Sequence, residues 1–291
     1  MSNNNRFNEE FLHTFDPTSA EEVRNIVSAH GIKCSPEDPV PAKLLSANID
    51  LFVPFWVEIV NLSLEYGDMD GLKSAVLIPL IKDLSSTVDR EDFKNYRPVS
   101  NLPFVSKIVE RVVQIRLERH MIKNDLMMSK NYGYRKNYST EMLLLKVIDD
   151  MFKSFDRNIP TVVILLDLSA AFDTVDHKKL LEILQEDIGI RGTALKWFES
   201  FLTNRMQKVK IGNTFSDIIK LLFGVPQGSV LGPILFKIYI RSFYRYVIET
   251  KFEVEGFADH HQLYKQFLIA MQQKALCSDI NVPLYSILQC G

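Results

Sequence analysis

The 291-residue chain lacks several features that would quickly assign it to a class of protein. It has three cysteines, Cys34, Cys277 and Cys290, without a CxxC pair or zinc spacing, so a reduced intracellular protein, cytoplasmic or nuclear, is expected. The formal net charge is −2, so no overall basic excess indicates a nucleic-acid-binding protein. The N-terminus has no apolar signal-peptide core, and glycine and proline interrupt the longest charge-free run, LLFGVPQGSVLGPILF. We therefore expect no membrane span and no disulfide partner.

What the chain does have is the composition of a folded globular protein. Hydrophobic residues make up 46% and charged residues 24%, and the length is sufficient for a large buried core. Helical and strand patterns follow each other without a regular βαβ repeat, so the predicted fold class is α+β. We expect a helical leader over residues 1–70, with residues 1–16 loose, a mixed domain over 71–270 and a divergent tail over 271–291.

A basic helix is predicted within VSNLPFVSKIVERVVQIRLERHM, where Ile108, Val109, Val112 and Ile115 share one face. Cationic residues occupy its other faces: Lys107, Arg111, Arg116, Arg119 and Lys123. Two interpretations stay open, namely a solvated helix face or a basic track along a nucleic-acid backbone.

Two aspartates follow predicted strands. Asp167 ends TVVILLD, a β-branched and leucine run that predicts a central strand buried on both faces. Asp259 lies in the turn of a hairpin predicted from KFEVEG and HQLYKQF. Acids at the ends of adjacent strands converge at one sheet edge, where they can share Mg²⁺ ions. The other interpretation is that each acid only caps a turn or a helix.

Other segments have simpler patterns. AVLIPLIK, QKVKI and DIIKLLF predict strands, HKKLLEILQED and TALKWFESFL predict helices, and DLSSTVDREDFKNYRP is typical of a loop.

Longer motifs occur in a fixed order: NYRPVSNLPFVSKIVERVV, YGYRKNYSTEMLLL, LLDLSAAFDTVDH, GVPQGSVLGPILF and FADHHQLY. With them, from about Leu51 to Phe267, the chain resembles the reverse transcriptases of non-LTR retrotransposons of the LINE/jockey type. The resemblance implies a right-hand polymerase fold of fingers and ferredoxin-like palm that copies RNA into DNA. It also implies an RNA template, a DNA primer and dNTP as partners, and two Mg²⁺ ions as cofactor.

The resemblance also implies roles for individual residues. Asp167 is similar to the first metal-binding aspartate of these enzymes, and Asp259 to the first aspartate of their Tyr/Phe-Ala-Asp-Asp hairpin. Phe172 is similar to the aromatic gate whose ring crowds a 2′-hydroxyl, although a core aromatic is the other interpretation. Gln227 resembles the glutamine that contacts the nucleotide, and Gly228 lets the backbone approach the substrate closely.

Three cations belong to the fingers motifs by the same resemblance. Lys82 and Arg97 resemble the residues that bind the triphosphate, and Arg97 offers bidentate contacts to phosphate oxygens. Lys82 is equally typical of a solvated strand end. Arg135 falls in the next motif, and its role is left open.

The sequence departs from the family at its catalytic hairpin. His260 stands where the family has a second aspartate, and His261 follows it. The substitution removes a negative charge, and neutral imidazole suits Zn²⁺ or Ni²⁺ better than Mg²⁺. Adjacent histidines on a strand point to opposite faces, which argues against a zinc site made by the pair. Loss of a metal-site partner typically costs about 10–100-fold in activity.

Two further departures point the same way. The family's Asn-Asp pair is missing near Arg241 and Ser242, and the resemblance stops at about Met271. We expect a fragment without thumb, endonuclease or RNase H region. Three hypotheses follow: a reverse transcriptase domain with impaired activity, a catalytically dead module that still binds RNA or an RNA–DNA duplex, and a poorly folded product without a role.

Overall fold

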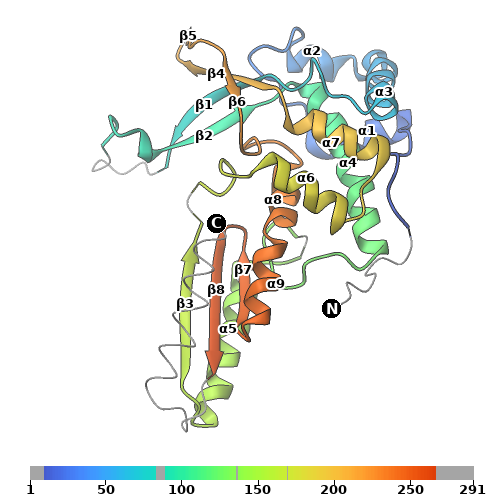
Figure 1. Cartoon of the computed structure of the whole chain (residues 1–291). Helices are drawn as coiled ribbons and strands as arrows, with labels where there is room; N and C mark the ends of the chain where they lie inside the picture. Colours follow the sequence, from blue (N-terminus) through green and yellow to red (C-terminus); the bar gives the residue numbers. More distant parts are fainter. Residues whose placement is uncertain (1–9, 83–88, 136, 169, 267–291) are drawn as a thin grey trace. The chain divides into compact units, whose positions relative to one another are not determined.

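The computed structural model describes residues 10–82, 89–135, 137–168 and 170–266. The chain divides into two compact units, each built from two separate stretches. The first unit comprises Met1–Met127 and Phe172–Leu235, and the second comprises Met128–Ala171 and Phe236–Gly291. Both contain helices and strands (Figure 1), so the predicted mixture of α and β structure is confirmed. The division at residues 70 and 270 stays a prediction, and the tail 271–291 lies outside the described residues.

The first unit is predominantly helical. Its helices are, in chain order, α1 (Ala20–His30), α2 (Ala42–Ala47), α3 (Ile49–Tyr66), the 3₁₀ turn η1 (Phe93–Asn95), α4 (Phe104–Lys123), α6 (His177–Glu186) and α7 (Gly192–Leu202). Helix α3 contacts α1, α4 and α7, and α6 contacts α7. The centre of this packing is aromatic, with Trp197, Phe198 and Phe201 fully buried on α7. The helices predicted over HKKLLEILQED and TALKWFESFL are confirmed as α6 and α7.

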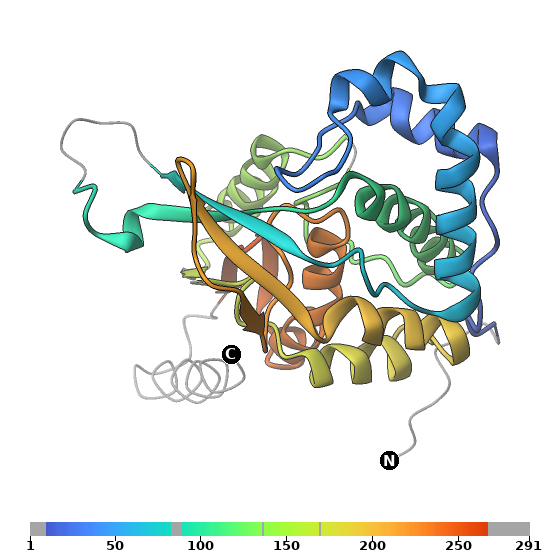
Figure 2. The same ribbon diagram turned by 90° about the horizontal axis from the view of Figure 1, so that it is seen from above.

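The strands of the first unit form one sheet in the order β2-β1-β4-β5, with β6 also paired to β4 (Figure 2). They are β1 (Ala75–Ile81), β2 (Tyr96–Asn101), β4 (Arg205–Ile211), β5 (Thr214–Phe215) and β6 (Ile219–Leu221). The loop predicted up to Pro98 was wrong at its end, because β2 begins at Tyr96. Among the described strands β2 lies at an edge, where a proline without an N–H group is tolerated.

The loose leader predicted for residues 1–16 was wrong for the part that is described. Leu12 forms a parallel bridge with Ile190, and its amide donates to the carbonyl of Gly189 at 3.0 Å. Phe15 is buried against Trp197 with an edge-to-face geometry, the ring centroids 6.0 Å apart. The sequence of this stretch is polar, but two apolar side chains are enough to fix it to α7 and to the turn before it.

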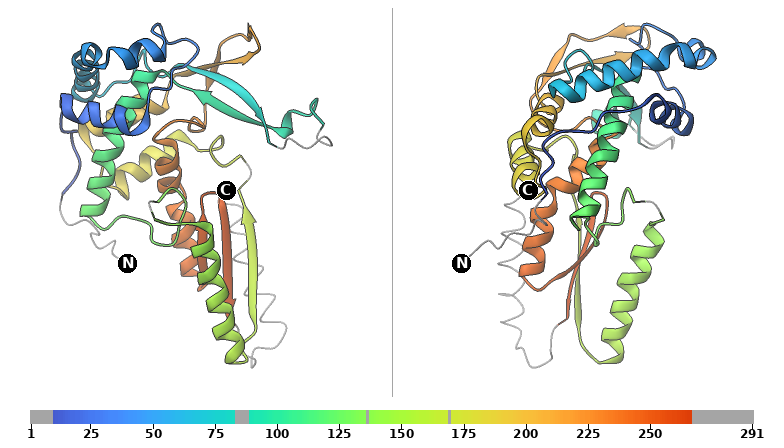
Figure 3. Two further views of the ribbon diagram at one scale, coloured as in Figure 1. Left: turned by 180° about the vertical axis from the view of Figure 1, so that it is seen from behind. Right: turned by 90° about the vertical axis from the view of Figure 1, so that its right-hand side faces the viewer.

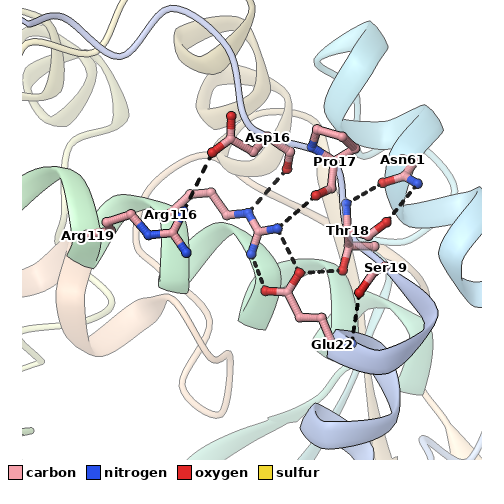
Figure 4. A network of polar contacts seen from close by, with 8 residues as sticks. All are labelled: Asp16, Pro17, Thr18, Ser19, Glu22, Asn61, Arg116 and Arg119. Atoms are coloured by element: carbon pink, nitrogen blue, oxygen red, sulfur yellow. Dashed lines mark hydrogen bonds and ion pairs between the residues drawn. The ribbon is translucent and has the colours of Figure 1, made fainter.

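Neither of the two interpretations left open for the basic residues of α4 holds for Arg116, whose side chain is only 6% exposed. Its guanidinium donates to the backbone carbonyls of Asp16 (3.2 Å) and Pro17 (3.0 Å) and to both carboxylate oxygens of Glu22 (Figure 4). Arg119 lies one turn further on and pairs with Asp16 at 3.6 Å.

The remaining cations of α4 also have partners inside the unit. Lys107 donates to the carbonyl of Lys33, Arg111 to Gln114, and Lys123 to Glu10. Much of the positive charge of α4 is therefore used to hold the segment before α1 and the segment after it.

The second unit is a small sheet covered on both faces. Its strands have the order β3-β8-β7 and are β3 (Thr161–Asp167), β7 (Glu253–Phe257) and β8 (His260–Gln266). Helix α5 (Thr140–Asp156) and helix α9 (Arg241–Glu249) lie on opposite faces of this sheet (Figure 3). Leu143 and Val147 of α5 pack on Tyr264. Helix α8 (Gly232–Tyr239) contains the boundary between the two units.

The prediction that residues 161–167 form a central strand, buried on both faces, was wrong. Within the described residues β3 pairs only with β8, and Leu165 is 75% exposed. A run of valine, isoleucine and leucine is common to central and edge strands, so the pattern alone did not reveal a missing neighbour.

Two general features complete the fold. Among the described residues, no helix combines the length and the apolar character that crossing a bilayer requires. Cys34 is a free thiol, and Cys277 and Cys290 lie outside the described residues.

Candidate active site

The two aspartates at the predicted strand ends lie together at one end of the second unit's sheet. Asp167 is the last residue of β3 and pairs directly with His260, the first residue of β8. Asp259 lies in the two-residue turn between β7 and β8. The Nδ1 atom of His260 is 3.2 Å from Oδ1 of Asp167, and its Nε2 atom is 4.0 Å from Oδ1 of Asp259. The imidazole thus stands between the two carboxylates.

All three side chains reach solvent. The side chains of Asp167 and His260 are 65% and 63% exposed, and that of Asp259 is 36% exposed. One ligand atom from each residue lies within 4.8 Å of the other two. Because two carboxylates and a neutral imidazole are all metal ligands, this donor set fits a divalent cation. It departs from the all-oxygen set that Mg²⁺ prefers, as the sequence predicted.

The turn that carries Asp259 has an unusual backbone. Ala258 has φ +58°, the left-handed value that a two-residue hairpin loop requires at its first position and that glycine or asparagine usually supplies. The segment before α5 holds it there. Asn131 donates its side-chain amide to the carbonyl of Ala258 at 3.2 Å, and a Cβ on Gly133 would lie 2.4 Å from the amide nitrogen of Ala258. Lys237 in turn donates to the carbonyl of Gly133 at 2.6 Å.

His261 points to the opposite face of the sheet from His260 and is buried against α9. It is 1% exposed, and its Nδ1 atom shares a 2.9 Å hydrogen bond with the hydroxyl of Tyr244 on α9. A Cβ at Gly256 would lie 2.0 Å from that hydroxyl oxygen and 2.6 Å from Nδ1, so only glycine leaves room for this pair. Burial, and then the charge of neighbouring His260, lowers the pKa of His261 to about 4. The ring is therefore neutral at physiological pH and packs as part of the core.

In the first unit, Phe172, Gln227 and Gly228 come together where two loops meet. The amide of Val225 donates to the carbonyl of Phe172 at 2.7 Å, and the side-chain amide of Gln227 donates to the carboxylate of Asp173 at 2.9 Å. Gly228 has φ +112°, and a Cβ there would lie 2.6 Å from the carbonyl oxygen of Ser100 on β2. The close approach at Gly228 in this structure is therefore to β2.

The same loop has a buried anchor that the sequence reasoning missed. Glu110 on α4 is fully buried and accepts hydrogen bonds from the amides of Val230 (2.7 Å) and Leu231 (3.1 Å). Burial raises the pKa of its carboxyl group, while these amides and the charge of buried Arg205 act in the opposite direction. The available signal was an acid in a largely apolar stretch, since Val109 precedes it and Val112 follows two residues later. Asp173, the partner of Gln227, was missed as well.

The predicted phosphate-binding cations lie on the first unit's sheet. Arg97 is exposed on β2 and pairs with Leu80 of β1, and the ladder continues to Lys82, whose amide donates to Asn95. Because side chains alternate along a strand, this register puts Lys82 and Arg97 on one face. Lys82 also donates its ammonium to the carbonyl of Lys94 at 2.7 Å.

Arg135, whose role was left open, belongs to the second unit. It donates to the backbone carbonyls of Met128 (3.2 Å) and Ser129 (3.1 Å) and lies over the ring of Tyr138. These contacts are those of a residue that closes the turn before α5.

The structure therefore divides the predicted site residues into groups. Asp167, Asp259 and His260 meet in the second unit. The nucleotide-binding candidates belong to the first unit, in two places: Phe172, Gln227 and Gly228 at the loop contact, and Lys82 and Arg97 on the sheet.

Comparison with known proteins assigns the chain to a family. Residues 88–273 match the family of reverse transcriptases (RNA-dependent DNA polymerases). Over 221 residues, 75% of this chain, it is 29% identical to the RNA-directed DNA polymerase from mobile element jockey of Drosophila melanogaster, and covers 24% of that protein. The jockey polymerase of Drosophila funebris is 27% identical over 266 residues, which are 90% of this chain and 28% of that protein.

A third relative extends the likeness to another mobile element. The probable RNA-directed DNA polymerase from transposon X-element of Drosophila melanogaster is 30% identical over 145 residues, half of this chain and 16% of the relative. The chain thus spans between 16% and 28% of the length of these relatives. The matched residues contain the five motifs quoted from the sequence, and the chain belongs to the reverse transcriptase family, as a member of the LINE/jockey type of non-LTR retrotransposons.

Proposed function

We propose that the chain is the RNA-directed DNA polymerase domain of a retrotransposon and that its activity is impaired. The observation that carries this proposal is the cluster of Asp167, Asp259 and His260 at one end of a three-stranded sheet, in a chain of this family. In this proposal the second unit is the palm and the sheet of the first unit belongs to the fingers. An intracellular location stays a prediction.

Asp167 and Asp259 would hold the divalent ions of a two-metal reaction. Such ions lower the pKa of the primer 3′-hydroxyl and neutralise the triphosphate when bound. Lys82 and Arg97 would bind the triphosphate oxygens, because they are cations on one face of the same strand pair. Gln227 would contact the incoming nucleotide, and the ring of Phe172 would crowd a 2′-hydroxyl and so select dNTPs.

The impairment follows from His260. The family's second aspartate would add a negative charge to the site, whereas imidazole adds none and puts a nitrogen between the two carboxylates. Loss of a metal-site partner typically costs about 10–100-fold, and loss of a direct ligand costs more. We therefore expect weak polymerase activity with Mg²⁺ and a gain of that order when the acid is restored.

Primer extension tests this proposal. A poly(rA)/oligo(dT) substrate with Mg²⁺ is given to the parent chain, to His260→Asp and to Asp167→Ala. Extension that is weak in the parent, about 10–100-fold faster in His260→Asp and absent in Asp167→Ala supports the proposal. Equal extension by the parent and His260→Asp would show that His260 does not impair the site. No extension by any of the three would contradict polymerase activity of this chain.

The alternative is a dead module that still binds RNA or an RNA–DNA duplex. Its sequence-based support was the basic fingers, and the basic residues of α4 do not add to it through Arg116, which is buried in an ion pair with Glu22. The alternative then rests on other cations such as Lys82 and Arg97. Salt-dependent RNA binding by a chain that extends no primer would favour it.

A further inference from the structure

The place of His260 in the hairpin is fixed by its neighbour. His261 lies on the face of the sheet that α9 covers, where it shares a hydrogen bond with Tyr244 in the space left by Gly256. Since side chains alternate along a strand, His260 must then lie on the other face of the sheet, where Asp167 is its cross-strand partner. A shift of the register by one residue would bury His260 and break the Tyr244 contact, so the hairpin keeps the backbone of His260 beside that of Asp167.

The donor set that results is two carboxylates and one imidazole. Mg²⁺ binds oxygen ligands in a strict octahedron and keeps much of its water. Imidazole nitrogen is a ligand for the divalent ions of the first transition row, from Mn²⁺ to Zn²⁺. Among these ions Mn²⁺ is grouped with Mg²⁺ for octahedral sites rich in oxygen, and it also belongs to the first-row series that binds mixed nitrogen and oxygen sites, as its weakest member.

We infer that Asp167, Asp259 and His260 form a mixed oxygen–nitrogen site that selects Mn²⁺ over Mg²⁺. His260 supplies one nitrogen and each aspartate supplies one oxygen, all within 4.8 Å. The inference rests on the proposed function only for what the ion does afterwards, since the binding of the ion needs no template, primer or nucleotide. By this inference, the replacement of the family's second aspartate by His260 changes which metal ion the site prefers, in addition to any loss of metal affinity.

The choice of histidine matters for this distinction. An alanine at position 260 would leave two carboxylates, which bind Mg²⁺ and Mn²⁺ by oxygen alone. An aspartate would restore an all-oxygen set with one more negative charge. Only histidine adds a nitrogen, so the ratio of Mn²⁺ to Mg²⁺ affinity, and not either affinity alone, reports its part.

The test is Mn²⁺ binding to the whole chain without nucleic acid, at one fixed pH for all samples. Free Mn²⁺ is measured by its electron paramagnetic resonance signal, and Mg²⁺ is added as competitor. The samples are the parent, His260→Asp, His260→Ala and Asp167→Ala. His30→Asp is the matched control, since it makes the same substitution at an exposed histidine at the end of α1. Circular dichroism confirms that each variant is folded.

We expect the ratio of Mn²⁺ to Mg²⁺ affinity to be higher in the parent chain than in His260→Asp, by about tenfold or more. Spin-echo modulation from a directly bound ¹⁴N nucleus should be present in the parent and in His30→Asp, and absent in His260→Ala. Asp167→Ala should bind Mn²⁺ at least about tenfold more weakly. Equal Mn²⁺/Mg²⁺ ratios in the parent and His260→Asp, or a parent without nitrogen modulation, would overturn the inference.

These outcomes are separable from those of the polymerase test. A chain that binds Mn²⁺ through nitrogen but extends no primer with Mn²⁺ keeps this inference and contradicts the proposed function. A chain that extends primers with Mg²⁺ and shows no nitrogen modulation keeps the proposed function and contradicts this inference.

Discussion

Replacement of Arg116 by methionine should destabilise the first unit severely. The guanidinium is 6% exposed and makes hydrogen bonds to Glu22 and to the carbonyls of Asp16 and Pro17 (Figure 4). Removing one partner of a buried ion pair costs about 3–5 kcal/mol. Because the Glu22 side chain is 25% exposed and can be rehydrated, we expect a value near the lower limit, about 3 kcal/mol.

The measurement is urea unfolding followed by tryptophan fluorescence. Both tryptophans, Trp56 and Trp197, lie in the first unit and are buried, so their emission reports on this unit. With a slope at the upper end of the usual range, ~3 kcal/mol per molar urea, the midpoint should fall by about 1 M.

Arg119→Met is the matched control on the same helix. Arg119 is 65% exposed, and its ion pair within the described part of the chain is to Asp16 at 3.6 Å, so its loss should cost less than about 1 kcal/mol. In a double-mutant cycle, Arg116→Met and Glu22→Gln should also couple, because the second change costs less once the first partner is gone. Equal midpoints for the two arginine variants, or strictly additive effects of Arg116→Met and Glu22→Gln, would refute the reasoning.

Three further outcomes follow from particular contacts. Glu110→Ala should lower stability by about 2–6 kcal/mol in urea unfolding, since two backbone amides lose their buried acceptor at about 1–3 kcal/mol each. Gly256→Ala should expose the second unit's hairpin to limited proteolysis, because its Cβ would lie 2.0 Å from the Tyr244 oxygen. Gly212→Ala should not, because Gly212 belongs to the first unit and an alanine there, at φ +59°, strains only its own turn. The hydrogen bond from Arg116 holds the pKa of Glu22 below its ordinary 4.5. The stability that ionised Glu22 contributes is therefore complete above pH 4.5 and is lost as the pH falls below it. Glu22→Gln should flatten that part of the pH–stability curve.

Those features that depend on local sequence pattern were predictable. The β7–β8 hairpin with Asp259 in its turn is confirmed, because alternation on both sides of a short turn leaves few other arrangements. The meeting of Asp167 with that turn also follows from strand ends that share one edge. In both cases the information lies within about ten residues of the acid.

Features that depend on distant partners were not predictable. Nothing near Arg116 distinguishes it from Arg119 on the same helix, and only the fold brings Glu22 to one of them. Glu110 has the same origin, since its partners are backbone amides 120 and 121 residues away. A buried charged group is costly unless it is paired, and a single sequence does not show where the pair will come from.

The two histidines of the β7–β8 hairpin have opposite consequences for the chain. His261 is part of the packing with Tyr244 and Gly256, so a change there would disturb the hairpin itself. His260 is 63% exposed, and a change there alters the charge and the ligand atoms beside Asp167 without touching that packing. Because side chains alternate along β8, the residue that packs in the hairpin and the residue that faces the aspartates are neighbours in the sequence. A chain can lose the family's second aspartate and keep the frame that held it, which is why restoring one side chain is a fair test of the whole site.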